Sequence, residues 1–392
     1  MSMAGKSKVS DVARTLCVGL LAVLGFNGFA FGEEVEITPY LQNVTKNSVV
    51  VRWITAELKG GVVGYGLEGK TDLHATEEAK SYVLHEVPLA GLEAGKAYTY
   101  TVESGGQTFT GKFRTAPEAD QPFTFAVWGD NRTHPDKHKP VADQMAKHQI
   151  DLAISVGDIV TRGRDIEEYK KEFFDPGQHL FRNVPFFVAV GNHEYGMDKD
   201  LDLFRSVLTQ PGNERYFAFT YGNSRFVILD SNDRRNPIEK QLDWLLEEFK
   251  SKAYQEAEFH FLFLHHAPYC WDWYGGEKKI EEAIVPLAEK YMVDVFFGGH
   301  FHCYERGMKT HNGFDTYYVV TGGGGGEFTR GWGEGAPKGK QREFMTVHDW
   351  KYHFVLLTVE GRTLHYIAKD KDGLVMDEFT IRHKIAKRWP EP

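Results

Sequence analysis

The sequence has few cysteines, no long uninterrupted apolar run and no excess of basic residues. Only three of its 392 residues are cysteine, which excludes a small disulfide-stapled domain, and no C-x-x-C pair offers a structural thiolate zinc site. The formal net charge of −9 leaves no evident basic surface for nucleic acid or for an anionic membrane. What remains is a globular chain with 42% hydrophobic residues, long enough for two domains. It would need local positive charge, such as metal ions, to hold an anionic substrate.

The N-terminal segment has the layout of a secretory signal peptide. Three basic residues precede the apolar stretch TLCVGLLAVLGFNGFAFG, and the small residues Ala30 and Gly32 are spaced for cleavage. A permanent membrane anchor is the weaker interpretation, because glycines and Asn27 interrupt the run before it reaches the roughly 18–20 apolar residues that a spanning helix needs. We therefore expect residues 1–32 to be removed. The product would be secreted or periplasmic, with no stable membrane anchor.

Two cysteines, Cys270 and Cys303, remain after that cleavage. Each follows a histidine-bearing stretch, so the two thiols can be neighbours in the fold. A single disulfide bridge stays open in an oxidising compartment, but packed thiols are the favoured interpretation.

Two regions with different sequence periodicity follow the leader. Residues 34–117 alternate apolar and polar side chains, in runs such as SVVVRWIT and AYTYTVES, which predicts a small antiparallel β-sandwich. Beyond a proline-bearing linker, residues 121–383 alternate continuous apolar strands with amphipathic helices, for example over 239–251 and 279–291, and end in β-hairpins. Continuous apolar strands are typical of an α/β fold whose sheets are covered on both faces.

Five of the apolar strands end in side chains that can bind a metal. These are Asp130, Asp158, Asn192, His265 and His300, and His302 follows two residues later. A single residue of this kind more often caps a helix or packs in the core. Five strand ends of this kind predict a shared site, since ligand sites of α/β proteins lie where strand carboxyl ends open into loops.

The donor set is oxygen and imidazole, which suits zinc, manganese or iron. His300 and His302 are one residue apart, so each can serve one of two ions, with Asp158 as the best placed bridge. Two ions roughly 3.5–4 Å apart would clamp a phosphoryl group and supply hydroxide from a bridging water near neutral pH. His193, next to Asn192 in GNHEYG, would then protonate the leaving oxygen as general acid.

These residues, in the order GD, GD, GNHE, HH and GHFHCYER, resemble the calcineurin-like metallophosphoesterases. The GNHE and GHFHCYER stretches are most similar to the purple acid phosphatases, and residues 34–117 resemble the fibronectin-III-like domain of that subgroup. The resemblance extends over about residues 34–383. It implies a four-layer α/β/β/α catalytic fold over 121–383 and phosphoester hydrolysis at a dinuclear metal centre.

The resemblance also implies a ligand set for each ion. One ion would be held by Asp130, Asp158 and His302, and the other by Asp158, Asn192, His265 and His300, with Asp158 bridging the two. His265 is preferred because HHAPY matches the His-x-x-x-Tyr spacing of the family from its first histidine, and His266 stays a competitor.

The sequence departs from the family pattern at two positions. Thr161 stands where the purple enzymes have a tyrosinate ligand, so the purple colour should be absent. Arg132 stands where the broader superfamily has a histidine; it would bind substrate phosphate or offset the carboxylates, and a structural salt bridge is the equal alternative. Asn131 is a further candidate for contact with the phosphate or the hydroxide. Glu194 can orient His193, and an exposed loop carboxylate or helix cap is the equal alternative.

The expected function is an exported, metal-dependent phosphoester hydrolase of the acid phosphatase type, acting on a small-molecule phosphomonoester. Metal-bound hydroxide would be the nucleophile, with Asp158 and His193 as catalytic residues. Two alternatives stay open: a phosphodiesterase acting on nucleotides or phospholipid head groups, and a degenerate extracellular binding protein without catalysis.

Overall fold

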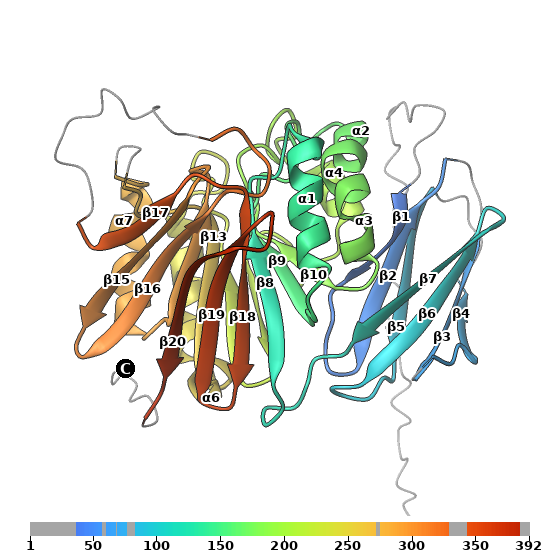
Figure 1. The fold of residues 1–392 in the computed structure, drawn as a ribbon, viewed down its shortest axis with the longest axis horizontal. Coiled ribbons are helices and arrows are strands. Elements are labelled where there is room, and N and C mark those ends of the chain that lie inside the picture. Colours follow the sequence, from blue (N-terminus) through green and yellow to red (C-terminus); the bar gives the residue numbers. More distant parts are fainter. Residues whose placement is uncertain are drawn as a thin grey trace, which may run out of the picture.

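The computed structural model of this protein describes residues 37–56, 60–67, 69–76, 83–271, 275–328 and 343–384 (Figure 1). The predicted signal peptide, residues 1–32, lies outside the described residues. No helix among the described residues is long and apolar enough to cross a bilayer.

The strands form three sheets. A nine-stranded sheet has the order β20 (Val375–Arg382), β19 (Thr363–Asp370), β18 (His353–Glu360), β8 (Phe123–Trp128), β9 (Leu152–Ser155), β10 (Phe186–Val188), β1 (Ile37–Gln42), β2 (Ser48–Ile54) and β5 (Leu84–Ala90). A seven-stranded sheet has the order β11 (Phe217–Tyr221), β12 (Ser224–Ile228), β13 (Phe259–His266), β14 (Val295–Gly299), β16 (Phe314–Thr321), β15 (Tyr304–His311) and β17 (Met345–Asp349). A four-stranded sheet has the order β4 (Leu73–Thr76), β3 (Gly61–Leu67), β6 (Ala97–Ser104) and β7 (Gln107–Arg114).

Short helices lie between the strands of residues 121–383. They are α1 (Pro135–Met145), α2 (Ile166–Glu168), the π-helix η1 (Tyr169–Phe174), α3 (Asp175–Phe181), α4 (Asp202–Val207), α5 (Glu239–Lys250), α6 (Lys252–Glu256), α7 (Lys278–Ala283) and α8 (Val285–Lys290). The segment 279–291, which the periodicity predicts as one helix, forms two, because Pro286 in the first turn of α8 has no amide hydrogen to continue the preceding helix.

The two large sheets pack face to face, and helices cover their outer faces. Phe125 and Val127 of β8 belong to the apolar core between the sheets, whereas Trp128, on the opposite face, packs with residues of α1 and η1. Leu262 and Leu264 of β13 pack with residues of α5 and α8 on the outer side of the second sheet. Successive side chains of a strand point to opposite faces, so only a strand buried on both faces is apolar throughout. The predicted four-layer α/β/β/α fold is confirmed.

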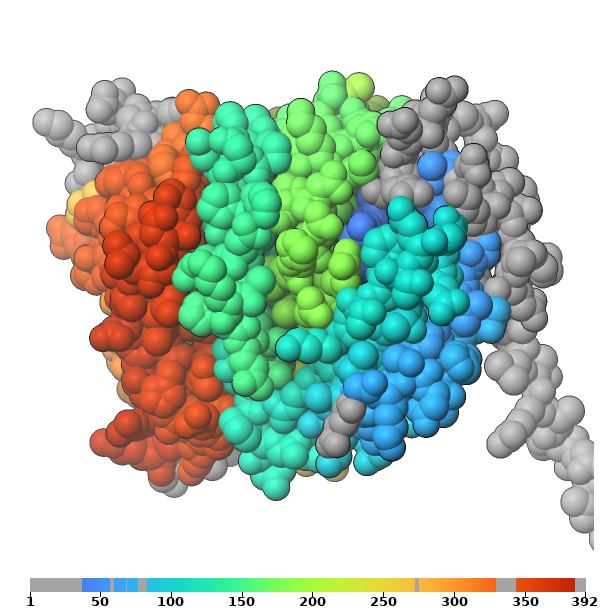
Figure 2. All heavy atoms as spheres, turned by 45° about the vertical axis from the view of Figure 1, so that its right-hand side comes forward, coloured from blue at the N-terminus to red at the C-terminus, as the bar shows by residue number. Residues whose placement is uncertain are grey.

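The N-terminal strands join the large sheet. β1 pairs parallel with β10 through Gln42 and Phe186, and the Gln42 side chain donates to the Phe186 carbonyl at 2.8 Å. The four-stranded sheet lies against the N-terminal strands that extend the nine-stranded sheet. Its Tyr100 hydroxyl donates to the Arg182 carbonyl, beside α3, at 2.9 Å. Figure 2 shows these N-terminal residues, in blue to cyan, directly against the green helices that follow β9. The strands of the predicted β-sandwich are present, but one of its sheets continues into the large sheet of residues 121–383, which the sequence did not predict.

Cys270 and Cys303 are both buried, and no disulfide joins them. Their sulfur atoms and a carboxylate oxygen of Glu305 lie within 4.8 Å of one another. The arrangement agrees with the favoured interpretation of packed thiols.

Candidate metal centre

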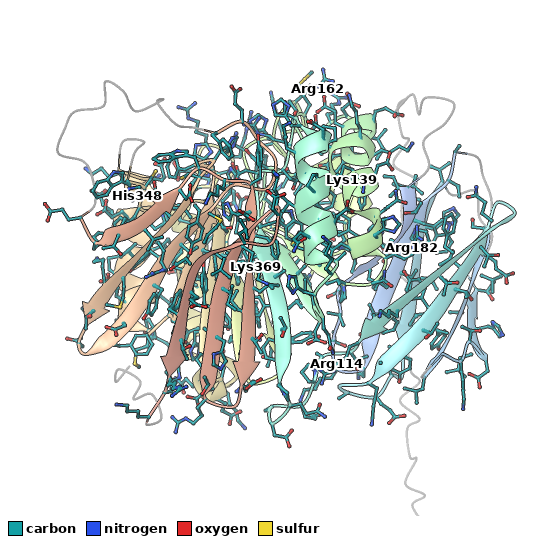
Figure 3. The ribbon with its side chains drawn as sticks, in the orientation of Figure 1. Arg114, Lys139, Arg162, Arg182, His348 and Lys369 are labelled. Atoms are coloured by element: carbon teal, nitrogen blue, oxygen red, sulfur yellow. The ribbon has the colours of Figure 1, made fainter. Side chains whose placement is uncertain are left out.

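The strands that end in candidate ligands converge at one edge of the molecule. β8, β9 and β10 are neighbours in the nine-stranded sheet, and β13 and β14 are neighbours in the seven-stranded sheet. Their carboxyl ends and following loops lie along the upper edge in Figure 1, and Figure 3 labels Arg162, in the loop after β9, at this edge. The site is therefore built jointly by the two sheets.

Three of the strand-end residues have left-handed backbone conformations. The φ angles are 56° at Asp130, 55° at Asp158 and 69° at His300. This conformation costs a non-glycine residue about 1–2 kcal/mol, and such strain is concentrated at functional sites. Here it turns the chain sharply at the end of each strand, so that the side chain or the backbone amide points toward the neighbouring strand ends. The amide of His300 donates to both carboxylate oxygens of Asp130, at 3.1 and 3.0 Å.

Asp130, Asp158 and His265 each place one donor atom within 4.8 Å of the other two. His302 extends this group, since its Nε2 lies 3.4 Å from Asp130 Oδ1. Its Nδ1 donates to the carbonyl oxygen of Glu327, so Nε2, which faces Asp130, is the nitrogen that can bind a metal ion.

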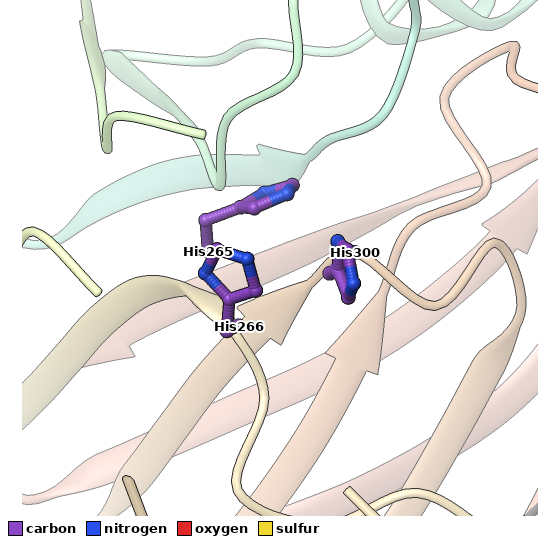
Figure 4. Close-up of side chains that lie close together, drawn as sticks. All are labelled: His265, His266 and His300. Atoms are coloured by element: carbon purple, nitrogen blue, oxygen red, sulfur yellow. The ribbon is translucent and has the colours of Figure 1, made fainter. Parts of the chain in front are cut away.

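His265 also faces a second group. Its Nε2 lies 3.1 Å from Asn192 Oδ1 and 3.3 Å from Asp158 Oδ1, while its Nδ1 bonds the Val156 carbonyl at 2.8 Å. Donor atoms of His265, His266 and His300 lie within 4.8 Å of one another (Figure 4). Asp158 and His265 therefore lie where the two groups meet.

The structure separates the roles of the two adjacent histidines. His265 is fully buried against the carboxylates. His266 bonds Ser231 Oγ through Nδ1 at 2.9 Å and lines an open cleft. The geometry favours His265 as the ligand, although His266 stays within reach of the His300 side.

The run Gly322–Gly326 brings backbone against the site. The amide of Gly324 donates to the Gly129 carbonyl at 2.8 Å, and the amide of Gly326 to the Asp130 carbonyl at 2.7 Å. A Cβ at Gly322 would lie 2.9 Å from an Asp130 carboxylate oxygen, and one at Gly326 would lie 2.7 Å from the His302 ring. Glycine is therefore required for this close approach.

The buried charges of the site depend on one another. Burial disfavours the ionised form of Asp158, but His265, followed by His193 and Arg132, holds the pKa of this carboxyl well below its usual range. Burial likewise disfavours the charged form of His265. The nearby Asp158 and Asp130 carboxylates have the larger combined effect and raise the His265 pKa to about 9. Burial, together with charged His265, lowers the pKa of His300 to about 4. Carboxylate, amide and imidazole donors buried around shared oxygens fit two cations of the zinc, manganese or iron type.

His193 lies beside Asp158 with one ring nitrogen already engaged. Its Nδ1 donates to the Thr161 carbonyl at 2.7 Å, so the proton on Nδ1 is fixed by an oxygen that can only accept. Its Nε2 lies 3.9 Å from Asp158 Oδ2, and the side chain is 27% exposed. The His193 ring therefore presents Nε2 to the site and to solvent.

The other two candidate substrate ligands differ in orientation. The Arg132 Nε donates to Asp158 Oδ2 at 3.3 Å, which puts the guanidinium at the carboxylate where the two ligand groups meet. Asn131 is fully buried, and its amide donates to the Ile159 and Glu172 carbonyls while its oxygen accepts from Trp128. Its hydrogen-bonding groups are directed into the protein, so we do not include Asn131 in the proposed substrate site.

Thr161 is held away from the ligand groups. Its hydroxyl bonds the Glu172 carboxylate at 3.0 Å and Thr133 Oγ1 at 3.0 Å. Thr161 therefore contributes its carbonyl, which fixes His193, rather than its side chain.

Glu194 has a role that the sequence interpretation missed. Its buried carboxylate accepts the amides of Asp158, Ile159 and Gly191, at 2.9, 2.8 and 2.6 Å. It ties the loop after β9 to the loop after β10, while the Thr161 carbonyl orients His193 instead. The GNHE motif contains Glu194, but nothing in the sequence indicates which backbone amides it reaches.

Burial, followed by the Asp158 charge, raises the pKa of Glu194 to about 7. Above that pH, replacing Glu194 by glutamine should destabilise the protein by about 2–4 kcal/mol, because the glutamine NH₂ would face backbone N–H groups that now donate to a carboxylate. Urea unfolding of the variant measures the change. Glu247→Gln, on the exposed side of α5, is the matched control. Equal stability of the two variants would contradict the proposed tie between the loops.

An open cleft of about 600 Å³ adjoins the centre. Its lining includes Asn192, His266 and His300 from the site and Arg234 and Arg235 from the loop between β12 and α5. This volume lies within the range of small-molecule sites.

Comparison with known proteins supports the family suggested by the sequence motifs. The calcineurin-like phosphoesterase family matches residues 83–304. Purple acid phosphatase 15 of Arabidopsis thaliana is 25% identical over 294 residues, covering 62% of this chain and 54% of that protein. A probable inactive purple acid phosphatase 27 of the same plant is 26% identical over 281 residues, covering 61% and 45%. The chain thus spans about half the length of these curated relatives.

The fold also matches a solved structure of this group. The purple acid phosphatase PPD1 from yellow lupin (Lupinus luteus) seeds superposes with a TM-score of 0.73 at 20% identity, over 89% of this chain and 74% of that one. The ordered strand-end residues, the two facing sheets and a family match over more than half of the chain agree with one another. This protein belongs to the calcineurin-like phosphoesterase family.

Proposed function

We propose that this protein is a phosphomonoesterase with a dinuclear metal centre. The observation that carries the proposal is the position of Asp158, whose carboxylate lies between the Asp130–His302 pair and the Asn192–His265 pair. One ion would be held by Asp130, Asp158 and His302, and the other by Asp158, Asn192, His265 and His300. Bound there, the ions would polarise the phosphoryl group and make water nucleophilic near neutral pH.

The protein's own residues then position the phosphate and move a proton. Arg132, anchored on Asp158, can turn its remaining guanidinium hydrogens to a phosphate oxygen. As water attacks phosphorus and the ester P–O bond breaks, the leaving oxygen takes the proton from Nε2 of His193. The Thr161 carbonyl holds His193 in the required ring orientation throughout.

Domain organisation and export are part of the same proposal. Residues 121–383 would form the catalytic domain, and residues 34–117 a fibronectin-III-like domain joined to it through β1 and β10. The charge and spacing of residues 1–32 support removal of a signal peptide and a secreted or periplasmic product.

The proposal is tested by metal analysis of protein purified without added metals, together with hydrolysis of 4-nitrophenyl phosphate and bis(4-nitrophenyl) phosphate. We expect two metal ions per chain and faster hydrolysis of the monoester. Chelation should remove the activity, and metal addition should restore it. Because Thr161 replaces the tyrosine, iron-loaded protein should lack the tyrosinate charge-transfer band in its visible spectrum.

Other outcomes of that experiment contradict the proposal in different ways. A preference for the bis ester would favour the phosphodiesterase alternative. Two bound metals without turnover of either ester would favour a non-catalytic protein, a state consistent with the name of the probable inactive relative. A protein that binds no metal and hydrolyses neither ester would contradict the proposed dinuclear centre.

A further inference from the structure

The cleft beside the metal centre carries two arginines that have no role in the proposed chemistry. Arg234 and Arg235 are exposed, and neither forms an ion pair with any residue that the structure describes. Lys279, also in the lining, is neutralised by Asp233 at 2.7 Å and Glu239 at 2.9 Å. Among the described residues, the two arginines therefore carry positive charge without an ion-pair partner, at the cleft of a chain whose net charge is −9.

Several hydrogen bonds hold the loop that carries these arginines. Buried Asp230 accepts from the amide of Asn232 at 3.0 Å and from the Asn236 side chain at 3.2 Å. Within the loop, the amides of Arg235 and Asn236 donate to the Asn232 carbonyl at 2.8 and 2.9 Å. These bonds restrict the backbone that presents Arg234 and Arg235, which lowers the entropic cost of using them.

The same loop is tied to the candidate catalytic loop. The hydroxyl of Tyr195, two residues after His193, donates to Asp230 Oδ2 at 2.6 Å. Asn232 also donates to the Val190 carbonyl at 2.8 Å, just before Asn192. The arginine loop and the GNHE loop therefore form one connected structure, and both line one cleft.

We infer that the substrate is a phosphoester whose leaving group carries a second anionic group, a phosphate or a carboxylate, bound by Arg234 and Arg235. The inference rests on the proposed function and specifies its substrate class. The cleft is lined by Asn192 and His300 as well as by the arginines, so one small molecule can contact both. Guanidinium groups bind phosphate and carboxylate in a bidentate manner. The exposed Glu277 in the lining carries the opposite charge, so the second anion is expected on the arginine side.

The test compares matched substrates that differ only in the second anion. Phenyl phosphate is paired with 4-carboxyphenyl phosphate, and adenosine 5′-monophosphate with adenosine 3′,5′-bisphosphate. For the metal-loaded full chain, we expect kcat/KM to favour the doubly anionic member of at least one pair. In Arg234→Gln/Arg235→Gln that preference should fall about tenfold, mainly through KM, which corresponds to about 1.4 kcal/mol. A fall confined to the carboxylate pair identifies a carboxylate as the second anion, and one confined to the adenosine pair identifies a phosphate.

Lys240→Gln/Lys250→Gln removes the same charge from α5 outside the cleft and should leave the preference as it is in the unaltered protein. Calorimetric binding of phenylphosphonate and 4-carboxyphenylphosphonate, which cannot be hydrolysed, tests the carboxylate arm without turnover. If the arginine variant changes kcat/KM equally for both members of each pair, or changes neither, the inference about the second anion is wrong. The proposed phosphomonoesterase function would be unaffected by that result. If the unaltered protein hydrolyses none of the four esters, the proposed function itself fails.

Discussion

Replacing Asp158 by asparagine is expected to lower phosphomonoesterase activity by at least about 10³-fold, because several kcal/mol of transition-state stabilisation are attributed to metal ions in such sites. The carboxylate is fully buried and lies 3.3 Å from the Nε2 of His265, where the two ligand groups meet. Asparagine has nearly the same shape but no charge, so it removes the bridge without opening a cavity. Steady-state kinetics and metal content per chain are the two measurements.

The metal content separates the bridging role from a purely structural one. We expect fewer than two ions per chain in Asp158→Asn, while Asp143→Asn, on the exposed side of α1, keeps two and serves as control. The asparagine oxygen can still accept the His193 amide, which donates to Asp158 Oδ1 at 2.9 Å, so the loop should keep its conformation. Retention of both ions with full activity would show that Asp158 is not the bridge.

The residues of the candidate metal centre could be proposed from the sequence because strand termini are easy to recognise in it. Strands buried on both faces read as continuous apolar runs, so a polar residue directly after such a run marks the strand end. Parallel strands carry their carboxyl ends at one edge of a sheet, which places Asp130 near Asp158. The two sheets meet face to face, as the family resemblance implied, and this brings His265 and His300 to the same edge.

The direction of an individual loop side chain was less predictable. Asn131 is adjacent to Asp130, yet its amide turns inward to the Ile159 and Glu172 carbonyls, because the left-handed conformation at Asp130 redirects the chain. Glu194 was interpreted either as a partner of His193 or as an exposed loop carboxylate or helix cap, but it is buried and accepts three backbone amides from two loops. The hydrogen-bond partners of such side chains depend on which backbone groups lack a partner when the loops pack. The periodicity of the sequence contains no information about those groups.

The alternation of apolar and polar residues also could not predict that the N-terminal strands join the large sheet. Alternation predicts the strands of residues 34–117, but strand pairing across about 140 residues depends on which sheet edge is available. β10 has only three residues, and β1 covers its edge through Gln42. The sandwich therefore supports the strand whose following loop carries Asn192 and His193.

Replacing His193 by alanine should lower kcat by about 10²–10³-fold for alkyl phosphates, the range expected on loss of a general acid. The effect should be much smaller for 4-nitrophenyl phosphate, since 4-nitrophenolate leaves without being protonated. Only the His193 Nε2 is available for this proton, because Nδ1 donates to the Thr161 carbonyl. Metal content should stay at two per chain, and the exposed His179→Ala serves as control. Equal losses for both leaving groups would assign His193 to positioning the phosphate, because a residue that only binds phosphate lowers the rate without regard to the leaving group.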